Sequence, residues 1–280
     1  MSKKVIVTHI FPDLDAIGAA WLLVRFHPDY SQTDFAFVPA GDTYNNQPVD
    51  SDPSVIHVDT GMGQFDHHQL SAQTSASQLV FNYLKQANHI TLKHQAALER
   101  LVKVIVDIDN FADCFWPEAS ADRYDLTLSE IINNLKISGR LNDKELIYQG
   151  MILLDAVLTG LMIKIKVEAE IKSGQEFASP WGKAIAVESK HSLLSKLAQK
   201  LGYALVVRKE PKTGFVSIKS QPRPTIDLES IYRQLKTADT KASWFFHQSR
   251  HIIVNGSRHS PAVKPTVLSL EEIVAIVNQK

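Results

Sequence analysis

The chain has 280 residues, of which 44% are hydrophobic and 21% charged, values typical of a folded globular protein and not of a disordered or fibrous one. A single cysteine, Cys114, excludes an internal disulfide framework and a cysteine-rich zinc module. The net charge of zero hides an asymmetry: residues 1–180 carry 14 Lys and Arg against 23 Asp and Glu, whereas residues 181–280 carry 16 against 7. The first part is suited to binding cations and the second to binding anions such as phosphates, unless the two merely attract each other.

No segment has the pattern of a signal peptide or a membrane span. The apolar run at 5–7 is too short for a signal peptide. The most apolar later stretch, 151–167, is shorter than the ~20 apolar residues of a membrane span and contains three charged side chains. We expect this stretch to be a buried helix, and the protein to be cytoplasmic with no membrane partner.

The N-terminal part predicts a parallel sheet. Stretches 4–9, 35–39 and 54–59 have the apolar and β-branched composition of strands, and 16–26 predicts an apolar helix with small residues at its start. Strands that alternate with a crossover helix and loops are typical of parallel α/β domains.

Helices dominate the middle of the chain, and mixed elements follow. Helical patterns cover 76–86, 92–108, 126–137 and 144–172, with Ser75 as an expected N-cap and Thr127 with Glu130 as an expected capping box. A breaker at Ser179-Pro180 places a domain boundary at 177–181. Beyond it we expect strands at 183–187, 203–209, 215–220, 244–246 and 251–254, with a hairpin over 204–220, and helices at 192–201, 226–235 and 269–277.

Acidic and histidine side chains gather where the predicted elements end. They are His9, Asp13, Asp15, Asp59, Asp66, His67, His68 and the pair Asp107 and Asp109. One aspartate in a turn is usually structural, but the whole set offers more oxygen and nitrogen ligands than a single cation needs. Two divalent ions about 3.5–4 Å apart that share a carboxylate would use them all, and would hold both oxygens of a phosphoryl displacement.

These residues resemble the motifs of the DHH superfamily of phosphoesterases, which holds RecJ-type exonucleases, nanoRNases, cyclic-dinucleotide phosphodiesterases and family II pyrophosphatases. The motifs stand here as His-x-x-x-Asp-x-Asp at 9–15, Asp59 at a strand end, the triplet 66–68 and a later aspartate. The resemblance implies a parallel α/β metal-binding catalytic domain at 1–125, a helical connector at 126–178, and a smaller α+β, basic substrate-binding lobe at 179–280.

The resemblance also implies a role for each motif residue. His9 and Asp13 would bind one ion, Asp59 would bridge, and Asp15, His67 and Asp107 would bind the other ion, with Asp109 as the alternative to Asp107. Asp66 would orient a histidine, and His68 would face the substrate phosphate as a hydrogen-bond donor or general acid. The implied cofactors are two divalent cations, Mn²⁺ first and Mg²⁺ second.

The C-terminal part departs from the exonuclease and nanoRNase branches, because it lacks their Gly-Gly-x-x-x-His loop. It contains instead Trp244-Phe245-Phe246-His247 and Asn255-Gly256-Ser257-Arg258, which with Asp66-His67-His68-Gln69 resemble the melanocyte-proliferating-gene branch, described as 3′-5′ RNA exonucleases. We take His247, Asn255, Gly256, Ser257 and Arg258 as candidate phosphate contacts. The alternative for Arg258 is an exposed side chain on a β-turn.

The expected function is hydrolysis of phosphodiesters, in short oligonucleotides or nucleotide-like substrates, by a metal-dependent nuclease. Two alternatives stay open. One is an inorganic pyrophosphatase or exopolyphosphatase, although the basic residues are too dispersed for a compact pyrophosphate pocket. The other is a phosphodiester-binding regulatory protein with little turnover. A homodimer is compatible with the sequence.

Overall fold

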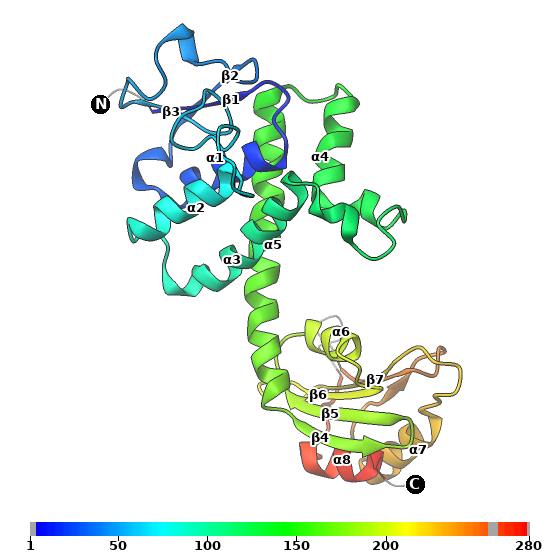
Figure 1. Ribbon diagram of the computed structural model, residues 1–280. Coiled ribbons are helices and arrows are strands. Elements are labelled where there is room, and N and C mark those ends of the chain that lie inside the picture. The colour runs from blue at the N-terminus through cyan, green and yellow to red at the C-terminus, as the bar shows by residue number, and fades with distance from the viewer. Residues whose placement is uncertain (1–3, 257–262, 279–280) are drawn as a thin grey trace. The chain divides into compact units, whose positions relative to one another are not determined.

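The computed structural model describes residues 4–256 and 263–278, and the chain divides into two compact units (Figure 1). Unit 1 is Met1–Met162 and unit 2 is Ile163–Lys280, so the division falls within helix α5 (Asp143–Lys172). Unit 1 has 11 Lys and Arg against 20 Asp and Glu, and unit 2 has 19 against 10, so the charge asymmetry follows the units. The functional division at 125 and 178 stays a prediction.

The sheet of unit 1 is parallel, as predicted. Its strands are β1 (Val5–His9), β2 (Asp34–Val38) and β3 (Val55–His57), in the order β2-β1-β3. His9 pairs with Val38 and Val7 pairs with His57 in the register. Because all three strands run the same way, the segments that follow β1 and β3 leave from one edge of the sheet, where open α/β sheets place their sites.

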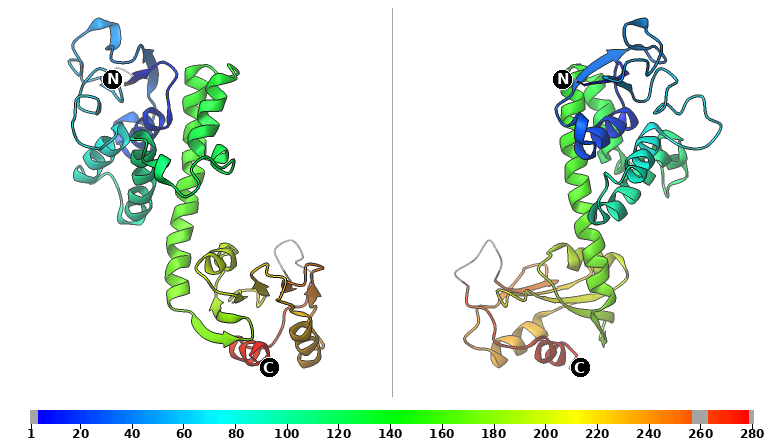
Figure 2. Two further views of the ribbon diagram at one scale, coloured as in Figure 1. Left: turned by 45° about the vertical axis from the view of Figure 1, so that its right-hand side comes forward. Right: turned by 90° about the vertical axis from the view of Figure 1, so that its left-hand side faces the viewer.

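Helix α1 (Leu14–Phe26) is the core of unit 1, and every residue from Leu14 to Leu23 is buried. Figures 1 and 2 show it beside α2 and α5. The remaining helices of the unit are α2 (Ala76–Gln86), α3 (Leu92–Asp109), α4 (Leu128–Ile137) and the start of α5, with 3-10 turns at Pro28–Tyr30, Tyr44–Asn46, Ala112–Phe115 and Tyr124–Leu126. Glycines allow the close approach: a Cβ on Gly18 would lie 2.5 Å from Ser77 Oγ, and one on Gly150 would lie 2.7 Å from Ile17 Cγ2.

Helix α5 is long and apolar enough to cross a membrane on length and composition alone. In unit 1 it contributes one buried stripe, made of Leu146, Ile147, Met151, Leu154 and Leu158. Asp155, midway along it, accepts hydrogen bonds from Trp21 Nε1 at 2.9 Å and Arg25 Nη2 at 2.6 Å. The expected buried helix is therefore buried along one side only: a third of its most apolar window is buried, and Ile152 is 58% exposed.

Unit 2 is a six-stranded sheet in the order β4-β5-β6-β7-β9-β8, in which only β5 and β6 pair in parallel. Its strands are β4 (Gln175–Ser179), β5 (Gly182–Glu188), β6 (Leu205–Lys209), β7 (Val216–Ser220), β8 (Phe245–Phe246) and β9 (Ile252–Asn255), and its helices are α6 (Leu193–Lys200), α7 (Glu229–Ala238) and α8 (Leu270–Val277). The predicted hairpin is β6–β7. The composition shift at 177–181 lies at the end of β4 and its turn into β5.

One predicted cap differs from the structure. Thr127 is the N-cap of α4, but its hydroxyl lies 3.0 Å from Ser129 Oγ and caps no backbone N–H. The expected capping box with Glu130 is therefore wrong, because a neighbouring hydroxyl competes for the threonine. A capping box does form in unit 2, between Ser269 and Glu272 at the start of α8.

Candidate metal centre

Asp59 follows β3 at the edge of the sheet, and its carboxylate is only 3% exposed. Its backbone turns sharply, with φ of 54°, and its N–H donates to the Phe65 carbonyl at 2.9 Å. Asp66 closes the same turn, because its Oδ2 accepts the N–H of Met62 at 2.7 Å. This compact turn explains why two motif aspartates stand so close in the sequence.

His9, Asp13 and Asp59 form the first group of potential ligands, each offering an atom within 4.8 Å of the others. His9 Nε2 lies 3.3 Å from Asp59 Oδ2 and 4.0 Å from Asp13 Oδ2. Its Nδ1 lies 2.9 Å from the Ile10 carbonyl and donates to it, which leaves Nε2 for a ligand. Asp13 also caps α1, where its Oδ1 accepts the N–H of Ala16 at 3.0 Å.

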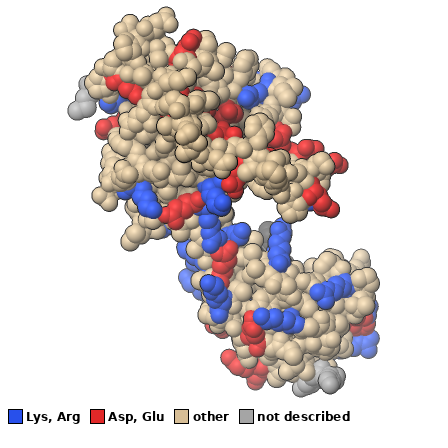
Figure 3. Space-filling model, in the orientation of Figure 1, with Lys and Arg blue, Asp and Glu red and all other residues tan. Residues whose placement is uncertain are grey.

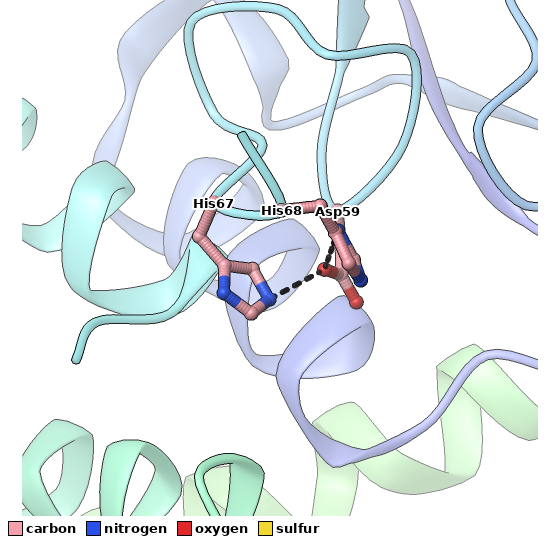
Figure 4. Close-up of side chains that lie close together, drawn as sticks. All are labelled: Asp59, His67 and His68. Atoms are coloured by element: carbon pink, nitrogen blue, oxygen red, sulfur yellow. Dashed lines mark ion pairs between the residues drawn. The ribbon is translucent and has the colours of Figure 1, made fainter. Parts of the chain in front are cut away.

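Asp15, His67 and Asp109 form the second group. His67 Nε2 lies 3.3 Å from Asp59 Oδ1, 3.4 Å from Asp109 Oδ2 and 3.8 Å from Asp15 Oδ2. Figure 4 shows the ring edge of His67 directed at the Asp59 carboxylate. One ring nitrogen cannot donate to three carboxylates at once, so the convergence is that of ligands around a shared centre.

The start of α2 holds Asp15 in place. Asp15 Oδ2 accepts the N–H of Ala76 at 2.7 Å, and Oδ1 accepts the N–H of Ser77 at 2.9 Å. The positive end of a helix dipole stabilises a carboxylate in this position. The second group is thereby built from α1, α2, α3 and the segment that carries His67.

Asp109, and not Asp107, belongs to this centre. Asp107 Oδ2 faces the ammonium of Lys103 at 3.7 Å, one turn away on α3. Residues two apart on a helix point to nearly opposite sides, so only one of the two aspartates can face the sheet edge. Asp109 is four residues after the buried Ile105 and shares its face, a spacing that favours Asp109. We therefore propose Asp109, the alternative that the sequence left open, as the ligand in place of Asp107.

His68 and Asp66 lie beside the two groups. Asp66 Oδ1 accepts the N–H of His68 at 3.0 Å and lies 2.7 Å from His68 Nδ1. When Nδ1 donates to Asp66, the other ring nitrogen, Nε2, is not bonded to Asp66. The side chain of His68 is 57% exposed and lines a cavity of about 410 Å³ together with His9, Asp13 and Asp59.

The buried carboxylates of the centre favour bound cations. Burial raises the pKa of Asp15 to about 8 and that of Asp109 to about 6, and neighbouring carboxylates add to both shifts. Burial acts in the same sense on Asp59, yet the imidazoles of His67 and His9 hold its pKa well below the usual range. Within the described chain, Asp59 Oδ1 and Asp109 Oδ2 are buried oxygens without a hydrogen-bond partner. Unpaired buried carboxylate oxygens are costly, and the donor set of carboxylates and imidazoles suits divalent cations.

Comparisons with known proteins found solved structures that resemble this chain. No protein-family model matches the chain, and no curated protein matches it. The pGpG-specific phosphodiesterase PggH of Vibrio cholerae is 14% identical with a TM-score of 0.33, covering 91% of this chain and 92% of that one. RecJ of Thermus thermophilus is 13% identical with a TM-score of 0.32, over 98% of this chain and 49% of that one. An exopolyphosphatase-related protein of Bacteroides fragilis is 14% identical with a TM-score of 0.27, over 98% and 90%.

The DHH motifs occur in this chain in their family order, and their side chains converge on Asp59. The motif order and the geometry of the ligands resemble those of the DHH superfamily. Membership of the superfamily is a proposal that rests on this resemblance. The narrower likeness to the melanocyte-proliferating-gene branch stays a proposal.

Outside the DHH motifs, His57 received no role from the sequence. It is buried, its Nε2 accepts the N–H of Tyr44 at 3.0 Å, and its Nδ1 lies 3.4 Å from Asp50 Oδ1. Asp50 Oδ2 in turn accepts the N–H of Gln64 at 3.1 Å. His57 and Asp50 thus tie the loop before β3 to the turn that carries Asp59. The only sequence signal is a histidine inside an apolar strand, two residues before a ligand.

Of the candidate phosphate contacts in unit 2, the structure describes His247, Asn255 and Gly256. Asn255 is fully buried: its Nδ2 donates to the carbonyls of Ser243 and Lys264 at 2.9 Å, and its Oδ1 accepts the N–H of Thr266 at 2.6 Å. Its assignment to substrate is therefore corrected to a structural role, because no polar atom of the amide is left over.

The other candidate phosphate contacts of unit 2 stay predictions. Gly256 has φ of 79°, and a Cβ there would lie 2.3 Å from the Phe215 ring. His247 Nδ1 lies 2.9 Å from Ser249 Oγ. His247 stays a prediction, and Ser257 and Arg258 lie outside the described residues.

Proposed function

We propose that this chain is a phosphoesterase that uses two divalent cations. The observation that carries the proposal is the position of Asp59, whose Oδ2 faces His9 and whose Oδ1 faces His67, each at 3.3 Å. A carboxylate whose two oxygens face two separate ligand groups is suited to bridge two ions. Two-metal sites of this kind bind both the attacking and the leaving oxygen of a phosphoryl displacement.

The ions would be held by His9, Asp13 and Asp59 on one side and by Asp59, Asp15, His67 and Asp109 on the other. Mn²⁺ fits this donor set better than Mg²⁺, because imidazole nitrogens stand beside the carboxylates and Mg²⁺ prefers oxygen. When bound, such ions polarise the phosphoryl oxygens and lower the pKa of water.

The chain itself supplies the proton-handling group. His68 lines the 410 Å³ cavity, and Asp66 fixes its ring through Nδ1. Its Nε2 would hydrogen-bond the substrate phosphate or donate a proton to the leaving oxygen, as a general acid does. Asp66 would act through His68, by keeping the ring in the required tautomer and orientation.

The proposed substrates are phosphodiesters in short oligonucleotides or nucleotide-like molecules. Figure 3 shows lysine and arginine side chains spread over the visible face of unit 2 and not gathered in one dense pocket. A compact polyanion such as pyrophosphate needs such a dense pocket, so hydrolysis of pyrophosphate or polyphosphate is the second candidate. A binding protein with little turnover is the third. The cytoplasmic location and the homodimer stay predictions.

Metal analysis combined with a generic substrate tests the proposal. The purified chain, incubated with Mn²⁺ and desalted, should retain about two ions per chain and hydrolyse bis-p-nitrophenyl phosphate. Asp59→Asn should lose both properties, because a neutral amide cannot bridge two cations. Asp107→Asn is the matched control, since that carboxylate faces Lys103, and it should retain both. An Asp59→Asn variant with wild-type turnover would overturn the proposal, and intact metal binding without turnover would favour the binding protein.

A further inference from the structure

A second hollow of about 300 Å³ adjoins the candidate metal centre within unit 1. It is lined by the end of α3, the start of α1 and one side of α4, and it shares Asp13 and Asp109 with the 410 Å³ cavity. The two hollows therefore meet at the proposed ligands. A substrate whose phosphate contacts the ions would extend from there into one or both hollows.

The second hollow has an apolar wall and an aromatic rim. Leu14, Ile105 and Ile108 line it, and Phe111 lies at its edge with 79% of the side chain exposed. Phe111 has φ of 56°, a left-handed backbone conformation that is uncommon for a bulky residue. Such conformations persist where the surroundings enforce them, and here the preceding Asn110 is bound through Nδ2 to the Thr74 carbonyl at 3.0 Å.

The polar groups of the hollow suit a neutral ligand better than a second phosphate. Asn133 offers an amide that can donate and accept, and Lys136, whose ammonium has no ion pair within the described chain, offers donors. Two further carboxylates, Asp113 and Glu130, also line the hollow. With the proposed ligands engaged by cations, these two acids outnumber the one lysine, so an additional phosphate would be repelled.

We propose that this hollow is a nucleobase subsite, in which the base next to the scissile phosphate stacks on Phe111 and bonds Asn133 and Lys136 through its edge. The inference rests on the proposed phosphoesterase function and narrows its substrates to nucleotide phosphodiesters. A flat, neutral, hydrogen-bonding base matches an aromatic rim, an apolar wall and a few polar groups, as ligand pockets generally require. Pyrophosphate and polyphosphate chains offer none of these features.

Two substrates separate base recognition from phosphate chemistry. One is a dinucleotide, and the other is the same molecule with the base removed from one side. Phe111→Leu keeps an apolar side chain but removes the flat ring. It should lower kcat/KM for the dinucleotide by roughly five- to 150-fold, the range that stacking on an aromatic ring provides, and leave the abasic substrate unchanged. Phe115→Leu, at the last position of the 3-10 turn that Phe111 precedes and 87% exposed but outside the hollow, should change neither value. Equal effects of Phe111→Leu on both substrates, or none, would refute the subsite.

A binding measurement keeps the test independent of turnover. The riboside of 2-aminopurine has no phosphate, and its fluorescence is quenched when the base stacks. Wild-type protein should quench it saturably, Phe111→Leu should bind it several-fold more weakly, and Phe115→Leu should match the wild type. Absent quenching by the wild type would overturn the subsite even if phosphodiesters are hydrolysed. Quenching without hydrolysis would support the subsite while refuting the phosphoesterase.

Discussion

Asp15 and Ser77 are joined twice, although they stand 62 residues apart in the chain. The N–H of Ser77 donates to Asp15 Oδ1 at 2.9 Å, and the Ser77 hydroxyl donates to the Asp15 carbonyl at 3.0 Å. All of these groups are buried. The start of α2 is thereby attached to the start of α1, and the carboxylate that we assign to the second ion is held in one orientation.

Ser77→Ala should therefore weaken metal binding without removing a ligand. The variant loses the hydroxyl bond that holds α2 on α1, and loss of a group that orients a metal ligand typically costs about 10–100-fold in affinity. Titration calorimetry with Mn²⁺ measures the change. Ser71→Ala, in an exposed loop, is the control and should bind as the wild type does. Unchanged affinity in Ser77→Ala would show that α2 does not position Asp15.

Asp109→Asn should reduce both metal retention and phosphodiesterase activity. The expected loss of activity exceeds the roughly 10–100-fold seen when a residue that only orients a ligand is removed, because here a ligand itself is neutralised. Parallel measurement of manganese content and turnover of bis-p-nitrophenyl phosphate gives both quantities. Asp107→Asn, two residues earlier on the opposite side of α3, serves as the comparison. If Asp107→Asn lost metal and activity while Asp109→Asn kept both, Asp107 would be the ligand and Asp109 would not.

Asp239 should make the stability of unit 2 sensitive to acid. The Thr266 hydroxyl bonds its carboxylate at 2.6 Å and the N–H of Val267 does so at 3.0 Å, and these bonds hold the pKa of Asp239 below its usual range. A lowered pKa in the folded state means that the stabilisation is complete above the ordinary value of about 4 and is lost as the pH falls through the folded value.

Asp239→Asn should accordingly lower the free energy of unfolding at pH 7 by roughly 1–3 kcal/mol, because an amide nitrogen cannot accept these bonds. Denaturant unfolding at a series of pH values measures the difference from the wild type. The difference should begin to shrink below about pH 4, where the carboxylate of the unfolded wild-type chain binds a proton, and should be lost as the pH falls through the lower pKa of the folded state. A difference in the free energy of unfolding that does not change with pH would show that the charge of Asp239 is not its cause.

Asn255→Ala should destabilise unit 2 and leave substrate binding unchanged. The buried amide satisfies two carbonyls and one buried N–H, so its removal leaves these groups without their bonds, at a cost of roughly 1–3 kcal/mol. Thermal unfolding gives the stability, and KM for a phosphodiester well below the transition gives binding. Asn278→Ala, at the exposed end of α8, is the control. A raised KM at wild-type stability would restore Asn255 as a substrate contact.

Much of the candidate centre could be predicted from the sequence, because its pattern is local. Apolar runs that end in His9 and Asp59 identify strand ends, and parallel strands bring such ends to one edge of a sheet. The choice between Asp107 and Asp109 is also contained in the sequence, in the spacing from the buried Ile105 on α3. The phase of that helix is enough to select Asp109, because residues four apart share a face and residues two apart do not.

Contacts between distant segments were decided only by the tertiary structure. Asn255 looks like an exposed phosphate contact in its Asn-Gly-Ser-Arg string, but the fold surrounds it with the carbonyls of Ser243 and Lys264. The bond between Asp15 and Ser77 and the hollow that α4 forms beside α3 likewise join residues far apart in the chain. Short-range periodicity specifies strands, helices and their ends, whereas the partners of a buried polar group depend on which elements the hydrophobic core brings together.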